Sequence, residues 1–224
     1  MIFFTSDLHF HHNKIMQYSP IFRKYADLDE MREALISIWN DTIKKDDIVY
    51  NLGDFSMTSN LDKIIDTARR LNGRHILILG NHDYTIRKNR NQLLQEMKDD
   101  GNRLFESIED YVYLRLKEKG RELALSHYPM GGWEGQQHGS IMLHGHLHDY
   151  ITDIRGKILN VGFDLHGKIL SLDEILRFTD NLPVLPYRNE NDEIAQSIKA
   201  TNTIEARRKM IMRELERINK GNRI

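Results

Sequence analysis

The sequence predicts an α/β protein, because short apolar segments alternate with segments expected to be helical. The apolar segments cover residues 2–6, 47–52 and 75–79, and each has the length of a buried strand. Residues 29–44 and 60–72 lie between them and are expected to form helices. This alternation predicts a parallel sheet that is covered on both faces.

Three local signals support the helices. In the first one, apolar residues recur three or four positions apart, at Met31, Leu35, Ile38 and Trp39. The second ends before Gly73, and glycine is a common residue at helix C-termini. A further helix is expected to begin near Ser171, where Ser-Leu-Asp-Glu has the spacing of a capping box.

The second half of the chain predicts another sheet. Short strand-like segments occur at residues 111–117, 121–125, 141–144 and 157–161. Little room for helices remains between these segments, so we expect the second sheet to be more antiparallel than the first.

The C-terminal part of the sequence is predicted to form an extension that is separate from the main domain. Pro183 and Pro186 mark a break, which predicts a domain over 1–182 and a linker with an amphipathic helix over 183–224. Residues 190–220 are highly charged and have apolar side chains at Ile194, Ile198, Ile204, Ile211, Leu215 and Ile218. Two roles fit this helix with partial heptad character: packing against the domain, or pairing with a second copy as a homodimer.

Composition narrows the class of protein. The 224 residues carry a net charge of -1, so there is no global field to attract nucleic acid or an anionic membrane. The chain contains no cysteine, which leaves oxygen and nitrogen donors for any metal. There is no signal-peptide pattern and no apolar run of about 20 residues. We therefore expect a cytoplasmic protein without a membrane partner.

Five short motifs carry most of the functional information. They are Asp7-Leu8-His9, Gly53-Asp54, Gly80-Asn81-His82-Asp83, Ser126-His127 and Gly145-His146-Leu147-His148. The first three follow predicted strands, at the edge where open α/β sheets bind ligands. Their carboxylate, amide and imidazole groups suit ions such as Mn²⁺, Fe or Zn²⁺. Two such ions about 3.5–4 Å apart form a site for phosphate-ester hydrolysis.

In this order, the five motifs resemble the signature of the calcineurin-like metallophosphoesterase superfamily, over residues 1 to about 165. The longer patterns Asp7-Leu8-His9-Phe10-His11-His12-Asn13 and Asn160-Val161-Gly162-Phe163-Asp164 resemble a small single-domain bacterial and phage branch. The resemblance implies a four-layer α/β/β/α sandwich, here with a C-terminal helical extension. It also implies a hydrolase that acts on phosphate esters.

The resemblance further assigns roles to residues. One metal would be held by Asp7, His9, Asp54 and His148. The other would be held by Asp54, Asn81, His127 and His146, so that Asp54 bridges the two ions. His82 would stay free of metal and stabilise or protonate the leaving oxygen, with Asp83 as a group that orients it. His82 and Asp54 are thus the expected catalytic residues, and the nucleophile would be a metal-bound hydroxide. Mn²⁺ is the expected ion, with Fe, Zn²⁺ and Ni²⁺ as alternatives.

His12 and Trp133 each fit two different roles. His12 lies close enough to the first motif to contact substrate, or it supports the loop. Trp133 lies in the glycine-rich loop 130–139 and either stacks on a ring of the substrate or packs in the protein. His75 and His166 are expected to be surface or packing residues, and His144 to support its neighbour.

The second and third motifs lack the arginines that another class of phosphatase has, and this bears on the substrate class. Protein Ser/Thr phosphatases have arginines beside the second and third motifs; here Gly53-Asp54 is followed by Phe-Ser-Met, and Leu79 precedes Gly80-Asn81. The balanced charge favours a small phosphomonoester or phosphodiester, nucleotide-like or cyclic, over nucleic acid. The alternatives are a metal-dependent nuclease and a non-catalytic metal-containing scaffold that acts through its C-terminal helix.

Overall fold

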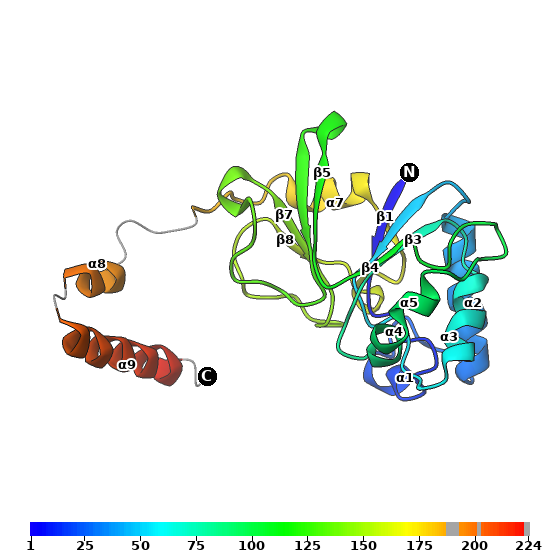
Figure 1. Ribbon diagram of the computed structural model, residues 1–224, viewed down its shortest axis with the longest axis horizontal. Helices are drawn as coiled ribbons and strands as arrows, with labels where there is room; N and C mark the ends of the chain where they lie inside the picture. The colour runs from blue at the N-terminus through cyan, green and yellow to red at the C-terminus, as the bar shows by residue number, and fades with distance from the viewer. Residues whose placement is uncertain (187–192, 201–202, 222–224) are drawn as a thin grey trace. The chain divides into compact units, whose positions relative to one another are not determined.

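The computed structural model describes residues 1–186, 193–200 and 203–221, and it confirms a mixed α/β fold with two sheets flanked by helices (Figure 1). The strands of the first sheet lie in the order β4-β3-β2-β1-β9. Their bounds are Ser107–Glu109 (β4), Arg74–Ile78 (β3), Ile48–Asn51 (β2), Ile2–Thr5 (β1) and Leu170–Ser171 (β9). Strands β1 to β4 pair in parallel, whereas β9 is antiparallel to β1. The predicted parallel sheet is therefore confirmed.

Alternate residues of the central strands face two different cores, as the strand period of two requires. Phe3 and Val49 belong to the core shared with the helices. Phe4 and Tyr50 point the other way and pack against the second sheet. The continuous apolar character of these strands follows, because both of their faces are buried.

The long helices lie close to their predicted positions. Helices α2 (Leu28–Thr42) and α3 (Leu61–Arg69) begin after Asp27 and Asn60, whose side chains accept hydrogen bonds from backbone N–H groups of the first turn. Helix α7 (Leu172–Thr179) begins at Ser171 with the predicted capping box. Four single-turn helices complete this part: α1 (Ile15–Tyr18), α4 (Tyr84–Lys88), α5 (Arg90–Leu93) and α6 (Phe163–His166).

The second sheet is a mixed sheet of four strands. Its strands are β5 (Val112–Leu116), β6 (Arg121–Leu125), β7 (Ile141–His144) and β8 (Ile158–Asn160). Only β5 and β6 are antiparallel, joined by a short 3₁₀ turn over Lys117–Lys119; β6–β7 and β7–β8 are parallel. The sheet was expected to be more antiparallel than the first; one of its three pairings is antiparallel, against one of four in the first sheet, so the difference between the sheets is small. Parallel neighbours need long crossovers, and the links after β6 and β7 are long enough to provide them.

The chain divides into two compact units, Met1–Leu185 and Pro186–Ile224. In the second unit, the single helix expected over residues 190–220 is two helices, α8 (Glu193–Ala200) and α9 (Ile204–Gly221). The side chain of Thr203 accepts a hydrogen bond from the N–H of Ala206 and so caps the start of α9. Residues 190–192 of the prediction, and the side chains of Ile194 and Ile218, lie outside the described residues.

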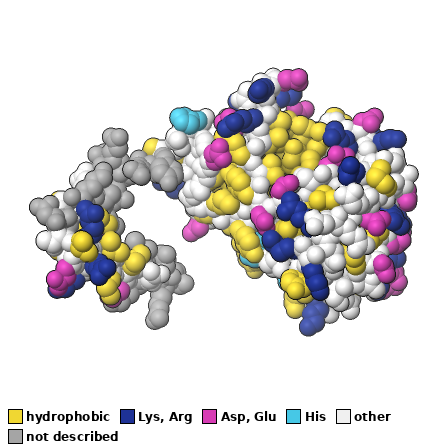
Figure 2. Space-filling view, in the orientation of Figure 1, with side chains coloured by type: hydrophobic (Ala, Val, Ile, Leu, Met, Phe, Trp, Pro, Cys, Tyr) yellow, Lys and Arg dark blue, Asp and Glu magenta, His cyan; other side chains and the backbone are white. Residues whose placement is uncertain are grey.

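On the face of the first unit drawn in Figure 2, lysine and arginine are interspersed with aspartate and glutamate. This mixture agrees with the balanced charge of the sequence. In the described part of the chain, no helix combines the length and the apolar character needed to cross a bilayer.

Candidate metal centre

The motif residues meet where strands of both sheets end. Asp7, Asp54 and Asn81 follow β1, β2 and β3, whose carboxyl ends lie at one edge of the first sheet. His127 and His146 follow β6 and β7, which are parallel neighbours in the second sheet. The parallel pairing that the prediction missed is thus what brings these two histidines together.

Backbone hydrogen bonds join the first two motif loops. The N–H groups of Asp7 and His9 donate to the carbonyl oxygens of Gly53 and Asp54, both at 2.9 Å. The pairing continues at Phe10, which donates to the carbonyl of Phe55 at 2.9 Å. The two loops therefore act as one support for their side chains.

Positive φ angles mark the same residues. Within the described residues, the non-glycine residues with positive φ are Asp7, His9, His11, Asp54, His146 and His148. Their φ values run from 50° to 70°, in the left-handed region that costs L-residues energy. Five of these six residues are predicted metal ligands. Strain of this kind persists where the surroundings enforce it, and it is common at functional sites.

Two glycines permit the close approach of the loops. A Cβ atom on Gly80 would lie 2.2 Å from Oδ1 of Asp54, and one on Gly145 would lie 1.9 Å from Oγ of Ser6. Any side chain at these positions would push two motif loops apart. The glycines that begin the third and fifth motifs are therefore required by packing rather than by their φ angles.

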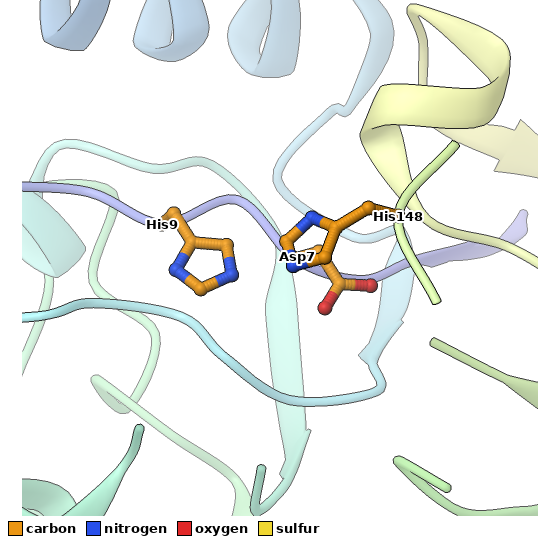
Figure 3. Close-up of side chains that lie close together, drawn as sticks. All are labelled: Asp7, His9 and His148. Atoms are coloured by element: carbon orange, nitrogen blue, oxygen red, sulfur yellow. The ribbon is translucent and has the colours of Figure 1, made fainter. Parts of the chain in front are cut away.

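The first group of candidate ligands is Asp7, His9 and His148, whose ligand atoms lie within 4.8 Å of one another (Figure 3). Nδ1 of His148 donates to a carboxylate oxygen of Asp164 at 2.8 Å. This bond holds the ring and leaves Nε2 with its lone pair, the form that binds a metal. Both ring nitrogens of His9 are buried without a hydrogen-bond partner.

The second group surrounds Asp54. Its Oδ2 atom lies 3.5 Å from Nε2 of His9 and 3.5 Å from Nε2 of His127, between the two predicted metal positions. Oδ1 of Asn81 lies 3.0 Å from Nε2 of His127 and 3.0 Å from Nδ1 of His146. Asp7, Asp54 and His127 also bring their ligand atoms within 4.8 Å of one another.

In these contacts, hydrogen-bond acceptors face one another without a donor between them. Nδ1 of His127 donates to the carbonyl of Leu52 at 2.8 Å, so the neutral ring has its lone pair on Nε2. That atom faces the Asp54 carboxylate and the Asn81 amide oxygen, which are also acceptors. A cation between them would satisfy all three groups, and the donor set therefore fits a divalent metal.

Burial also favours a bound cation. The pKa of Asp7 is raised to about 7 by desolvation, and the pKa of His9 is held well below its ordinary value for the same reason. The pKa of His148 is raised by its hydrogen bond to Asp164. A divalent ion would stabilise the ionised form of Asp7 and the neutral form of His9, which is the protonation state that ligands need.

A sequence model of the calcineurin-like phosphoesterase family matches residues 1–205. The chain belongs to this family. Calcineurin-like phosphoesterases are hydrolases, and members usually bind divalent metals, which agrees with the donor groups described above.

Individual relatives come from phages and an archaeon. The chain is 30% identical to the Gene 66 protein of Mycobacterium phage L5 over 200 residues, or 80% of this chain and 94% of that one. For the Gene 66 protein of Mycobacterium phage D29 the identity is 29%, over 81% of this chain and 96% of that one. An uncharacterized protein of Methanocaldococcus jannaschii is 39% identical over 83 residues, which is 37% of this chain and 46% of that one. The predicted resemblance to the family is thus confirmed, and two of these relatives are phage proteins that match over nearly their whole length.

A solved structure shares the fold. The crystal structure of a protein of unknown function from Aquifex aeolicus matches with a TM-score of 0.60 and 24% sequence identity. The match covers 80% of this chain and 98% of that one.

His82 and Asp83 hold different positions in the third motif. Nε2 of His82 lies 4.0 Å from Oδ2 of Asp54, and its side chain is 35% exposed. The Asp83 carboxylate is buried and accepts hydrogen bonds from the N–H groups of Gly80, Asp54 and Phe55. Asp83 therefore ties the second and third motif loops together, and its oxygens are used for this rather than to orient the His82 ring.

The structure also decides between the two readings of Trp133. The indole is buried against Ala124 and Met142 on the outer face of the second sheet. Its Nε1 donates to the carbonyl of Ser140 at 3.2 Å. Trp133 is thus a packing residue, and its expected alternative role as a substrate contact was wrong, because the ring is covered.

Four further histidines lie beside the site or in the protein core. The ring centroid of His12 lies 5.2 Å from that of His9, which belongs to the first group of candidate ligands. His11 makes a 2.9 Å hydrogen bond to Thr67 of α3, and His144 makes one of 2.8 Å to the carbonyl of Gly145. His75 is fully buried among aromatic rings, as a packing residue.

Arg23 is the main residue that sequence reasoning missed. Its guanidinium is buried, forms a 2.5 Å ion pair with Asp164, and lies 5.2 Å from the ring centroid of Phe163. It also donates to the carbonyl oxygens of Asp7 and Leu8, at 2.5 and 2.9 Å. Arg23 thus connects the first motif to the carboxylate that holds His148. Asp164 lies in a motif noted above, but nothing in the sequence around Arg23 indicates this contact.

Proposed function

We propose that this phosphoesterase uses two divalent cations, Mn²⁺ in the first place, to hydrolyse a small phosphodiester or phosphomonoester. The observation that supports two ions is the position of Asp54 Oδ2, which lies 3.5 Å from the facing nitrogens of both His9 and His127. A carboxylate oxygen between two imidazoles is where a bridging ligand would stand.

The chain's residues would divide the work as follows. Asp7, His9 and His148 would hold one cation, and Asn81, His127 and His146 the other, with Asp54 shared. When bound, the cations would supply a hydroxide nucleophile at neutral pH and neutralise charge on the phosphate. Arg23 and Asp164 keep His148 in the tautomer that a ligand requires.

His82 would serve the leaving group. Its ring lies beside Asp54 and is partly exposed, whereas the ring of His9 is buried. A histidine in this position can donate a proton or a hydrogen bond to the departing oxygen. We propose that it binds substrate and no metal.

A small substrate is supported by charge. Acidic and basic side chains are interspersed over the face in Figure 2, and the chain as a whole has a net charge of -1. A protein that grips many phosphates of nucleic acid needs a concentrated basic surface, because this attraction dominates such binding. A nucleotide-like or cyclic ester does not require one.

The test is hydrolysis by the purified, Mn²⁺-loaded protein. Asp54→Asn and His146→Ala should abolish hydrolysis of bis(4-nitrophenyl) phosphate while thermal unfolding remains cooperative, and a chelator should have the same effect. Screening mono-, di- and cyclic nucleotides beside single- and double-stranded DNA then identifies the substrate class. Undiminished turnover by the chelated protein would refute the proposal, and preferential cleavage of DNA would replace the small ester by the nuclease alternative.

A further inference from the structure

A cavity of about 400 Å³ opens beside the second group of candidate ligands. Asn81 and His127 form part of its wall. A substrate whose phosphate bound at these residues would therefore have the cavity next to it. The volume falls within the range of about 300–1,000 Å³ that is usual for small-molecule pockets.

Aromatic and apolar side chains line much of the cavity. Tyr84 begins α4 and is 71% exposed, and Tyr128 follows His127 and is 46% exposed. The ring of Tyr128 contacts the ligand group edge-on, with its centroid 4.8 Å from that of His146. Met130 adds a flexible apolar side chain to the same wall. Exposed tyrosine rings in a concave site are suited to contacts with another planar ring.

The charged groups in the cavity neutralise each other. Arg87 forms a 2.7 Å ion pair with Asp110, and both residues line the wall. A second phosphate of a substrate would meet the Asp110 carboxylate beside this guanidinium. An uncharged group is the better occupant, because it would not have to compete with the ion pair.

We propose that this cavity receives an aromatic ring carried by the ester group of the substrate, as in a nucleotide or an aryl phosphate ester. The inference rests on the proposed function, since it assumes that phosphate binds at the adjoining ligands. Two larger cavities, of about 510 and 570 Å³, have none of the candidate ligands in their walls and so do not adjoin the phosphate position.

The test compares phenylphosphonate with methylphosphonate, which differ by the ring and have no ester bond to cleave. Calorimetric titration of the full-length, Mn²⁺-loaded protein should show phenylphosphonate binding about tenfold more tightly, the effect expected for one stacked ring. In Tyr84→Leu and Tyr128→Leu this ratio should fall to less than about threefold. Phe178→Leu removes another exposed aromatic residue, on α7 and outside the cavity, and should keep the ratio of the wild-type protein.

An adenosine 5′-phosphonate distinguishes the two sources of the ring. Binding tighter than that of phenylphosphonate, and weakened by Tyr84→Leu, assigns the cavity to a nucleoside. Binding no tighter than that of methylphosphonate, with phenylphosphonate still preferred, assigns it to a smaller aryl group.

Equal affinities for phenyl- and methylphosphonate in the wild-type protein would overturn the inference, as would an unchanged ratio in both tyrosine variants. Hydrolysis without ring preference would overturn the inference and leave the proposed function standing. Ring-selective binding by a protein that hydrolyses no ester would retain the cavity and refute the proposed function.

Discussion

Removing the Arg23 side chain should destabilise the protein and weaken metal binding together. Arg23 is 1% exposed, and its guanidinium has three oxygen partners: the Asp164 carboxylate and the carbonyl oxygens of Asp7 and Leu8. Arg23→Met keeps much of the apolar volume and deletes every one of these interactions. It leaves Asp164 buried with only the ring of His148 as a polar partner.

The magnitude follows from this geometry. Breaking a buried ion pair by removing one partner costs about 3–5 kcal/mol, because the remaining charge is uncompensated. The two carbonyl oxygens lose donors as well, and charge-assisted hydrogen bonds contribute about 1.5–3 kcal/mol each. Their loss partly overlaps with that of the ion pair, so we expect the free energy of unfolding to fall by about 4 kcal/mol. Metal affinity should fall about 10- to 100-fold, the usual effect of losing a group that supports a ligand.

The assay is urea unfolding of metal-free protein, followed by circular dichroism, with Mn²⁺ binding measured separately by calorimetry. Arg115→Met is the control, because Arg115 is 63% exposed and its ion pair with Glu122 lies on the surface. The control should change the free energy of unfolding by less than about 0.5 kcal/mol. If Arg23→Met is also within about 1 kcal/mol of the wild-type protein, the reasoning about its buried network is refuted.

Two further predictions concern stability and association. The folded-state pKa of His75 lies well below its ordinary value because the ring is buried, so on acidification the unfolded chain takes up a proton that the folded chain does not. The free energy of unfolding therefore decreases as the pH falls below about 6.5. Between pH 6 and 5, urea titrations should show that the wild-type protein loses about 1 kcal/mol more of this free energy than His75→Leu does. Equal losses in the two proteins would contradict the proposed role of His75. In α9, Ile211 and Leu215 are 38% and 55% exposed, and we propose that this helix pairs with a second copy. Sedimentation should then show dimers that Ile211→Glu dissociates, and a monomeric wild-type protein would rule the pairing out.

Strands β1 to β3 of the first sheet could be predicted because they carry their own signal, whereas the short strands β4 and β9 were not predicted. Both faces of β1 to β3 are buried, so their residues are apolar in continuous runs, and the motif residues follow directly at the strand ends. The capping box at Ser171 is equally local and was read correctly. Such features depend on neighbours in sequence, which a single chain displays.

Features that depend on distant neighbours were missed. The direction of β7 relative to β6 depends on how a long crossover packs, and the short strands themselves look alike in either direction. Arg23 and Asp164 are 141 positions apart, and their pairing is evident only in the folded chain. The burial of Trp133 likewise depends on tertiary contacts. From the sequence alone, a tryptophan in a glycine-rich loop is equally suited to packing and to ligand contact.

Metal stoichiometry tests the central claim most directly. The metal-free protein is dialysed to equilibrium against Mn²⁺, and bound metal is counted by elemental analysis for the wild-type protein, Asp54→Ala and His82→Ala. We predict two ions for the wild-type protein, two for His82→Ala, and fewer than two for Asp54→Ala, because the Asp54 carboxylate lies between the facing nitrogens of His9 and His127. A single ion in the wild-type protein, or loss of an ion in His82→Ala, would contradict the account.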